Sequence, residues 1–324
     1  MKNNKILITG ATGFIGSHLA EFLTEKGFSV VAFDRYNINN DYGWLNKSKY
    51  KSDIEFILGD IRDYDSVINA MQGVDAVMHL AALCGIPYSY VSPMAYLRTN
   101  IEGTMNILNA GKTLNTPEII ITSTSETYGS AQYIPINEKH PLVGQSPYSA
   151  SKISADQLAI SYFRSFNLPI KIIRPFNAYG PRQSLRAVIP TIISQCLNSN
   201  VVKLGNLHTK RDFTYVLDLC SAFLEIKQNS EFGEITNVGM NQDITIDNLF
   251  NKIIKITNSK ASIETELLRS RPTSSEVDVL LCDNSKILKT TNWKPQYNID
   301  EGLNITVDWF KKYSKEIDIN HYHI

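Results

Sequence analysis

Cysteine, net charge and long apolar runs are all scarce in this chain of 324 residues, and each shortage excludes a class of protein. The four cysteines form no CxxC pair and no Cys/His cluster with metal-ligand spacing, so we expect no metal site and free thiols in a reducing compartment. No segment approaches the length of a membrane span, and the first residues lack the apolar stretch of a secretion signal. We therefore expect a cytoplasmic protein with no membrane partner.

The charges of the chain cancel, with 32 basic and 32 acidic side chains. No run of lysine and arginine marks a surface for nucleic acid or anionic lipid, so we expect no nucleic-acid partner. Hydrophobic residues make up 43% of the chain, which is ordinary for a globular protein with one large or two modest domains. A few local arginines can still hold an anionic ligand.

Short apolar runs alternate with stretches of helical periodicity through the first half of the chain. The expected strands are 5–9, 29–34, 54–58, 76–80, 118–122 and 170–174. The expected helices are 14–26, 64–71, 93–114 and 147–166. Runs that are apolar on both faces, such as 119–121, are typical of parallel strands covered by helices. The pattern predicts an α/β fold with a doubly wound parallel sheet of the Rossmann type.

A glycine-rich turn with the spacing GxxGxxG separates the first expected strand from the first helix. Gly10 would permit the tight turn, Gly13 would let the backbone approach a pyrophosphate, and Gly16 would let the helix pack closely on the sheet. Asp34 ends the second strand 18 residues after Gly16, where it can accept hydrogen bonds from ribose hydroxyls. A 2′-phosphate would meet this like charge, so we expect NAD, although Arg35 could pair with that phosphate and leaves NADP open.

Further cofactor contacts are expected at the later strand ends. Asp60 and Ile61 would hold the adenine, and the small residues around Ala81 would let a dinucleotide lie close to the backbone. The expected cofactor residues are Gly10, Gly13, Phe14, Ile15, Gly16, Asp34, Arg35, Asp60, Ile61, Leu80, Ala81, Ala82, Asn100, Ser123, Tyr148, Lys152 and Pro175.

Tyr148 and Lys152 lie four residues apart, so both project from one face of the expected helix. A free tyrosine has a pKa near ~10, too high for a base at neutral pH. A lysine ammonium one turn away, together with a positively charged nicotinamide, would favour the phenolate. Glu126, 22 residues before Tyr148, offers a carboxylate for a second proton. These residues predict an enzyme that removes a hydride from an alcohol carbon and then moves another proton.

The segments 9–16, 59–61, 79–82, 123–129, 148–152 and 174–181 together give the chain its resemblance to a known family. It resembles the extended short-chain dehydrogenase/reductases, the nucleotide-sugar epimerases and dehydratases, over nearly its full length. The resemblance implies a nucleotide-diphosphate sugar as substrate and a homodimer that pairs through the helices 93–114 and 147–166. It also implies substrate contacts from Ser89, Asn177, Arg186, Arg211 and Arg271.

The triplet formed by Thr124, Ser125 and Glu126 bears on which reaction is run. Many hexose 4,6-dehydratases have Thr-Asp-Glu there, whereas GDP-mannose 4,6-dehydratases and UDP-glucuronate decarboxylases resemble this chain in having Thr-Ser-Glu. The triplet alone therefore does not decide. The resemblance implies that Tyr148 deprotonates the C4 hydroxyl as its hydride passes to NAD, that Thr124 bonds the C4 oxygen, and that Glu126 takes the C5 proton. The C6 hydroxyl then leaves as water, helped by Ser125 or a water that it orients.

Four segments, 85–90, 145–150, 180–184 and 211–216, resemble one subgroup more closely. It is the LegB-type GDP-N-acetylglucosamine 4,6-dehydratase of legionaminic acid biosynthesis, which implies that substrate. The alternatives are a UDP-N-acetylglucosamine 4,6-dehydratase, a UDP-glucuronate decarboxylase, a 4-epimerase, and a dinucleotide-binding sensor without turnover. We expect residues 1–174 to form the NAD-binding domain, with segments around 211–238 returning to it. Residues 175–324 would form a smaller region that mainly binds the nucleotide sugar.

Overall fold

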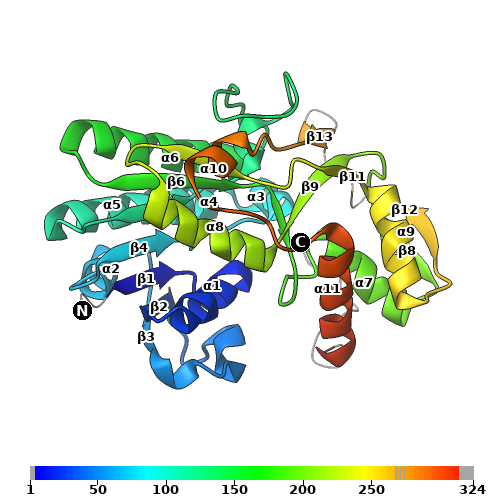
Figure 1. The fold of residues 1–324 in the computed structure, drawn as a ribbon, viewed down its shortest axis with the longest axis horizontal. Coiled ribbons are helices and arrows are strands. Elements are labelled where there is room, and N and C mark those ends of the chain that lie inside the picture. Colours follow the sequence, from blue (N-terminus) through cyan, green and yellow to red (C-terminus); the bar gives the residue numbers. More distant parts are fainter. Residues whose placement is uncertain (1–3, 267–268, 270–271, 273–274, 314–324) are drawn as a thin grey trace.

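A computed structural model describes residues 4–266, 269, 272 and 275–313 of the chain (Figure 1). Its main sheet has seven parallel strands in the order β10-β6-β5-β4-β1-β2-β3. The strands are β1 (Lys5–Thr9), β2 (Ser29–Arg35), β3 (Ile54–Gly59), β4 (Ala76–His79), β5 (Ile119–Thr122), β6 (Ile170–Pro175) and β10 (Ile235–Val238). The predicted fold class, an α/β protein with a doubly wound parallel sheet, is confirmed. All carboxyl ends lie at one edge, which is where the expected site residues gather.

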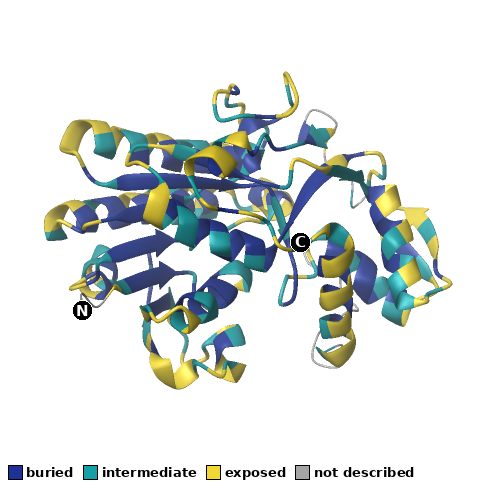
Figure 2. Cartoon of the chain, viewed as in Figure 1, coloured by how far each residue is buried: buried dark blue, intermediate teal, exposed yellow. Residues whose placement is uncertain are grey.

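Helices cover both faces of this sheet, and the buried strands between them are the dark layer of Figure 2. The helices α1 (Phe14–Glu25) and α8 (Val216–Asn229) pack together on one face. The other face carries α2 (Tyr64–Ala70), α5 (Gly103–Leu114) and α6 (Pro147–Phe166). Strand residues alternate between these two cores: Ile6 and Ile8 lie in the first, Leu7 in the second. The hydrophobic runs of the sequence are therefore buried on both sides.

The predicted helix 93–114 is continuous but not uniformly α-helical, which corrects the expectation. It consists of α4 (Pro93–Tyr96), a π-helical stretch labelled η3 (Leu97–Glu102) and α5. The wide turn contains Asn100, which is 1% exposed. Its side chain exchanges two hydrogen bonds of 2.9 Å with the backbone of Leu83 and donates a third, also 2.9 Å, to Ser151. These bonds offset the poorer geometry of the π turn and place it near functional residues, where such turns are frequent.

The remaining elements form a smaller region on the right of Figure 1 and the segments that connect it to the sheet. A mixed sheet joins β7 (Asn177–Tyr179), β9 (Lys210–Tyr215), β11 (Asp243–Thr245) and β13 (Val279–Leu280), and β8 (Val201–Leu204) pairs with β12 (Ser262–Thr265). The helices are α7 (Val188–Asn198), α9 (Ile246–Thr257), α10 (Ser285–Thr290) and α11 (Ile299–Tyr313). Within 211–238, α8 and β10 belong to the layers of the main sheet, whereas β9 lies in the smaller sheet.

None of the helices in the described part of the chain is both long and apolar enough to cross a membrane. Across the same residues, no group of three or more His, Cys, Asp or Glu side chains is arranged to hold a metal ion.

Candidate active site

The glycine-rich turn contains two glycines that the fold requires and one that it does not. Gly10 has φ +71°, and a Cβ there would lie 2.9 Å from the Cα of Ala81. A Cβ at Gly16 would collide with the carbonyl oxygen of Gly10. By contrast, a Cβ at Gly13 would meet only that carbonyl oxygen, at the ordinary distance of 3.4 Å. The space at Gly13 is therefore left open toward a ligand at the N-terminus of α1, which fits a pyrophosphate.

This difference predicts that two alanine variants affect different properties, one the stability of the fold and the other the affinity for NAD. Gly16→Ala should lower the free energy of unfolding by about 1–3 kcal/mol, because the new methyl group overlaps backbone atoms. Gly13→Ala should unfold as the wild type does but bind NAD more weakly, because the methyl group occupies the approach of the pyrophosphate. Thermal unfolding and NAD titration of both variants measure this. A stable Gly13→Ala variant with unchanged NAD affinity would contradict the assignment.

Asp34 lies near the carboxyl end of β2 and bonds to the glycine-rich turn. Its Oδ2 accepts hydrogen bonds from the backbone N of Thr12 (2.8 Å) and from Thr12 Oγ1 (2.6 Å), and its Oδ1 accepts from the backbone N of Arg35 (2.7 Å). A carboxylate has lone pairs beyond these three bonds, so Asp34 can still accept from a ribose hydroxyl. Asp60 follows β3 and forms a forked ion pair with Arg62, whose hydrogen bond lowers the pKa of the Asp60 carboxyl.

The end of β4 is fixed by Thr9, a contact that sequence reasoning missed. Thr9 Oγ1 accepts from the backbone N of Leu80 and of Ala81, both at 3.1 Å. Its own proton is then donated to Nδ1 of His79, 2.8 Å away. Burial lowers the pKa of His79 to about 3, so the ring is neutral. The expected cofactor segment 80–82 is thereby held against the glycine-rich turn.

The helix α6 begins where its sequence has a capping box. Ser146 and Ser149 exchange two bonds between side chain and backbone, at 3.1 and 2.9 Å, and a proline occupies the first turn. This start point places Tyr148 and Lys152 on the inward face, 8% and 4% exposed. Lys152 Nζ donates to the carbonyl oxygen of Thr122 at 2.6 Å. The expected catalytic pair therefore lies together at the end of β5.

Burial alone does not prepare Tyr148 to act as a base. Burial raises its pKa well above the usual value, although a hydrogen bond with the side chain of Thr124 partly opposes this. The charge of Glu126 raises the pKa of Tyr148 further. Burial also lowers the pKa of Lys152, against the attraction of Asp156. A phenolate at Tyr148 thus requires further positive charge, which a bound oxidised nicotinamide carries.

The turn that holds the other expected catalytic residues directly follows β5. Thr124 caps the short 3-10 helix η4 (Ser125–Tyr128), and its Oγ1 accepts from the backbone N of Glu126 at 3.3 Å. Ser125 is buried, at 3% exposure, whereas Thr124 and Glu126 are half-buried. Ser123, an expected cofactor residue, donates its hydroxyl to Asp156 at 2.6 Å. The turn therefore presents a carboxylate next to the tyrosine of α6.

The expected substrate residues occupy diverse environments. Ser89 is fully buried in α3 (Ile86–Val91) and donates to the carbonyl oxygen of Ile86 at 2.6 Å. Asn177 lies on β7, and its buried amide oxygen has no hydrogen-bond partner among the described residues. Arg186 is exposed, and its charge acts on Cys84, close to Tyr148.

Arg211 is buried on β9 at 6% exposure. Its Nη1 donates to its neighbour's carbonyl oxygen at 2.9 Å, and its Nη2 lies 3.6 Å from Glu276 Oε1. Arg271 lies outside the described residues. The structure thus brings Arg186 close to the Tyr148 region and gives Arg211 a carboxylate partner.

Sequence reasoning also missed the packing around the loop 83–85. The ring of Tyr96 stands edge-on to Tyr148, with centroids 6.2 Å apart, and its hydroxyl donates to the carbonyl oxygen of Gly85. Asn100 bonds the other end of this loop at Leu83. Tyr96 and Asn100 are four residues apart on one helical segment, a spacing that could have indicated a shared face. Between these anchors the solvent-accessible Cys84 lies near Tyr148 and Lys152.

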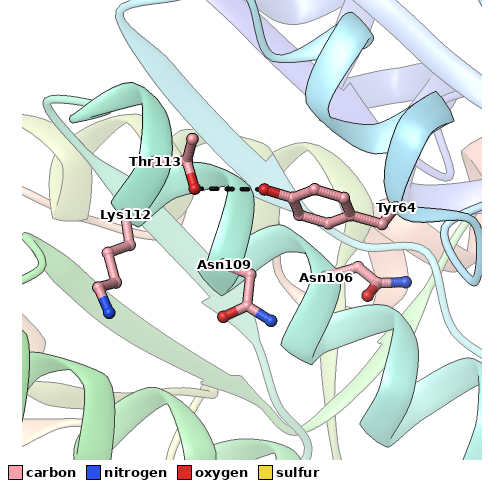
Figure 3. A pocket seen from close by; sticks show the side chains of 5 residues that line it. All are labelled: Tyr64, Asn106, Asn109, Lys112 and Thr113. Carbon is pink, nitrogen blue, oxygen red and sulfur yellow. Dashed lines mark hydrogen bonds between the residues drawn. The ribbon is translucent and has the colours of Figure 1, made fainter.

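A separate polar pocket of about 370 Å³ lies on the outer layer of helices (Figure 3). It is lined by Tyr64, Asn106, Asn109, Lys112 and Thr113 of α2 and α5. The hydroxyls of Tyr64 and Thr113 lie 3.2 Å apart across it. None of the residues expected in the cofactor, catalytic or substrate sites lines this pocket, so it is distinct from the candidate active site.

Comparison with known proteins identifies the family. The profile of the family described as GDP-mannose 4,6 dehydratase matches residues 7–306. A trifunctional UDP-glucose 4,6-dehydratase/UDP-4-keto-6-deoxy-D-glucose 3,5-epimerase/UDP-4-keto-L-rhamnose-reductase of Arabidopsis thaliana is 31% identical over 94% of this chain, which spans only 46% of that longer protein. A UDP-glucuronate 4-epimerase of Thermodesulfobacterium geofontis is 31% identical over 94% of this chain and 96% of its own length.

The fold agrees with these sequence matches. The structure of DesIV, a dTDP-glucose 4,6-dehydratase from Streptomyces venezuelae with NAD and TYD bound, superposes with a TM-score of 0.90. The match covers 97% of this chain and 99% of that one at 26% identity. Dehydratases and epimerases are both among the similar proteins, so the comparisons do not distinguish these two reactions. The chain belongs to the GDP-mannose 4,6 dehydratase family, within the NAD-dependent nucleotide-sugar dehydratases and epimerases.

Proposed function

We propose that this protein is an NAD-dependent 4,6-dehydratase of GDP-N-acetylglucosamine, acting in the cytoplasm in legionaminic acid biosynthesis. The observation that supports the reaction type is the half-buried Glu126 on the short helix η4 that follows β5, whose charge acts on Tyr148. A 4-epimerase has no use for a base at C5, whereas a dehydratase needs one. The identities of the sugar, N-acetylglucosamine, and of the nucleobase, guanine, rest on the resemblance of the segments 85–90, 145–150, 180–184 and 211–216.

The residues around the glycine-rich turn fit NAD. The open face of Gly13 would receive the pyrophosphate, Asp34 would accept from the adenosine ribose, and Asp60 and Ile61 would border the adenine. Lys152 on α6 would bond the nicotinamide ribose. Bound NAD would supply the hydride-transfer chemistry between C4 and C6 of the sugar.

The protein's own residues then move the protons. Tyr148 takes the proton of the C4 hydroxyl, and Thr124, which already bonds Tyr148, holds the C4 oxygen. The 4-keto group acidifies the C5 hydrogen, and Glu126 removes it. The C6 hydroxyl departs as water after receiving a proton through Ser125 or a water that Ser125 orients. Glu126 finally returns a proton to C5, so the overall reaction loses one water and is redox-neutral.

Two of the segments that suggest the substrate are tied together next to Tyr148. The hydroxyl oxygens of Tyr90 and Ser275 lie 2.5 Å apart, and Ser275 donates to the carbonyl oxygen of Gln145 at 2.6 Å. These bonds join α3 to the loop that precedes α6. The arrangement supports a sugar site formed by both segments. From the family resemblance we propose Asn177, Arg186, Arg211 and Arg271 as ligands of the diphosphate.

We also propose a homodimer that pairs through the helical layer of α4, η3, α5 and α6. Exposed apolar residues recur at helical spacing there: Met94 is 57% exposed, and Leu97 and Met105 are each 38% exposed. Phe166 at the end of α6 is 49% exposed. Burying this stripe against a second copy would remove apolar surface from water. Sedimentation of the protein should give twice the mass of the chain, and a monomer would contradict the proposal.

Product masses from a panel of substrates distinguish the candidate functions. The protein should be incubated with GDP-N-acetylglucosamine, UDP-N-acetylglucosamine and UDP-glucuronate. Loss of one water from GDP-N-acetylglucosamine supports the proposal. If the protein prefers UDP-N-acetylglucosamine, the nucleotide of the substrate is UDP and not GDP. Loss of carbon dioxide from UDP-glucuronate would identify a decarboxylase, and a product of unchanged mass an epimerase. Tight NAD binding without any product would favour a dinucleotide-binding sensor that has no turnover.

A further inference from the structure

Two buried ion pairs lie at the two ends of the adjacent strands β5 and β6, one at their amino ends and one at their carboxyl ends. Arg174 Nη2 lies 2.7 Å from Asp156 Oδ2, with side chains 1% and 0% exposed. Lys171 Nζ lies 2.7 Å from Glu118 Oε1, with side chains 5% and 9% exposed. Arg174 is near the carboxyl end of β6, on the same side of the sheet's strands as the candidate active site. Glu118 precedes β5 and therefore lies at the amino ends of the strands. Both pairs join a buried carboxylate to a buried cation at different ends of the strands, although Glu118 also lies 3.1 Å from Lys227 Nζ through its Oε2.

Asp156 faces the active site from inside the protein. It follows Lys152 by one turn of α6, so the two side chains share a face of the helix. Its Oδ2 accepts from Ser123 at 2.6 Å and from Arg174 at 2.7 Å. Its Oδ1 is buried and has no hydrogen-bond partner among the described residues. The Asp156 carboxylate thus pairs with the buried Arg174 and lies one helical turn from the buried Lys152.

Arg174 extends this arrangement to the turn that carries Glu126. Its Nη1 donates to the hydroxyl of Tyr128 at 2.8 Å, and its guanidinium lies 4.8 Å from the centroid of that ring. The Tyr128 hydroxyl in turn donates to Asn237 Oδ1 at 2.7 Å. Tyr128 is fully buried and is the last residue of η4. The ion pair therefore connects the lysine helix with the turn of the proposed C5 base.

Asp156 is the group that can keep Lys152 charged. The titratable groups that act on or are acted on by Lys152 are Asp156 on α6, Cys84 on the loop 83–85, and His79 on β4. The surrounding protein raises the pKa of the Cys84 thiol, and burial lowers that of His79 to about 3, so both are neutral near pH 7. Asp156 alone among them supplies negative charge against the desolvation of the ammonium. Apolar residues of similar volume could stabilise the fold as well as a buried ion pair does, which favours a functional role.

We propose that Asp156 is a positioning residue that holds Lys152 as a cation beside Tyr148, while its ion pair with Arg174 holds the turn carrying Glu126. Asp156 touches neither substrate nor cofactor in this account and acts through Lys152 and Arg174. The effect on turnover rests on the proposed function, but the charge of Lys152 does not. The two can therefore fail separately.

The first test measures the charge of Lys152 directly, without substrate. Lysine Nζ titrations are recorded by ¹⁵N NMR for the wild type, Asp156→Asn and Glu118→Gln, with the Lys152 signal assigned by Lys152→Arg. In Asp156→Asn the Lys152 midpoint should fall by at least about one pH unit, because the opposing charge is lost. Glu118→Gln removes the carboxylate of the ion pair at the amino ends of the strands and should leave the Lys152 midpoint in place. An unchanged midpoint in Asp156→Asn would overturn the proposal.

The second test follows the reaction. If Lys152 must be charged, the alkaline limb of the pH profile for sugar oxidation moves to lower pH in Asp156→Asn, and it stays in place in Glu118→Gln. Should Asp156→Asn fail to fold, the double variant Asp156→Leu/Arg174→Met replaces both members of the ion pair with apolar side chains, so that neither Asp156 nor Arg174 is left buried without the other. The double variant should fold and bind NAD, and the alkaline limb of its pH profile should move to lower pH, as in Asp156→Asn. A wild-type pH profile in the folded double variant would contradict the proposal.

Tyr128→Phe tests the other end of the ion pair. This variant keeps the ring and loses the hydroxyl that joins Arg174 to Asn237. Deuterium exchange at C5 should fall about tenfold, as for a displaced base, while NADH formation at C4 falls less. Equal losses in both steps would overturn the link to the turn. If the wild type oxidises none of the sugars offered, the proposed function fails, and the NMR titration still decides the role of Asp156.

Discussion

Replacing Tyr148 with phenylalanine should lower the rate of NADH formation from the sugar nucleotide by about 10²- to 10⁴-fold, the usual contribution of a general base. Tyr148 is the buried hydroxyl at the end of β5 that bonds Thr124, and it lies on the same face of α6 as Lys152. Without the phenol, the proposed acceptor of the C4 proton is missing. A rapid-mixing measurement of nicotinamide absorbance in a single turnover isolates this step.

Tyr162→Phe is the matched control for that experiment. Tyr162 lies on the same helix, and its hydroxyl donates to Asn109 Oδ1 at 2.6 Å, far along α6 from Lys152. The same atom is removed from the same element, so the oxidation rate should stay at the wild-type value. NAD affinity should be retained in both variants. If Tyr148→Phe oxidised the sugar as fast as Tyr162→Phe does, Tyr148 would not be the base.

Glu126→Gln should separate the two halves of the reaction. Oxidation at C4 continues and NADH accumulates, because Tyr148 and Lys152 are intact. Removal of the C5 proton should slow by about 10²-fold or more, since an amide cannot accept it. Mass spectrometry of the sugar nucleotide recovered from D₂O measures the deuterium that enters at C5.

Glu126→Asp is the conservative companion to this variant. It keeps a carboxylate on the turn η4 but withdraws it by one methylene, so C5 exchange should recover in part. The cap at Thr124 stays in place, because it bonds the backbone N of residue 126. Deuterium uptake in Glu126→Gln at the wild-type rate would remove Glu126 as the base and, with it, the argument for a dehydratase over an epimerase.

Much of the fold could be predicted because its patterns are local. The apolar run 119–121 and the capping serine at 146 each determine an element within a few residues, and β5 and α6 lie where they were expected. The sequence also predicted that Glu126 follows the strand β5 and that Tyr148 lies on the next long helix, as the positions of Glu126 in η4 and of Tyr148 in the first turn of α6 show.

Contacts between distant segments could not be predicted in the same way. Asp156 and Arg174 are 18 residues apart, and Arg174 and Tyr128 are 46 apart, so no local pattern indicates their bonds. The π turn around Asn100 depends on bonds to Leu83 and Ser151, which only the packed structure shows. Nor does the sequence show that Ser89 directs its hydroxyl to its own helix.

The most direct test of the proposed function is the mass of the product formed from GDP-N-acetylglucosamine in D₂O. We expect a sugar nucleotide that has lost one water and gained one deuterium at C5. The hydride that reaches C6 should carry no solvent deuterium, because it comes from C4 of the same sugar. A product of unchanged sugar composition, or one that lacks solvent deuterium at C5, would contradict the proposed function.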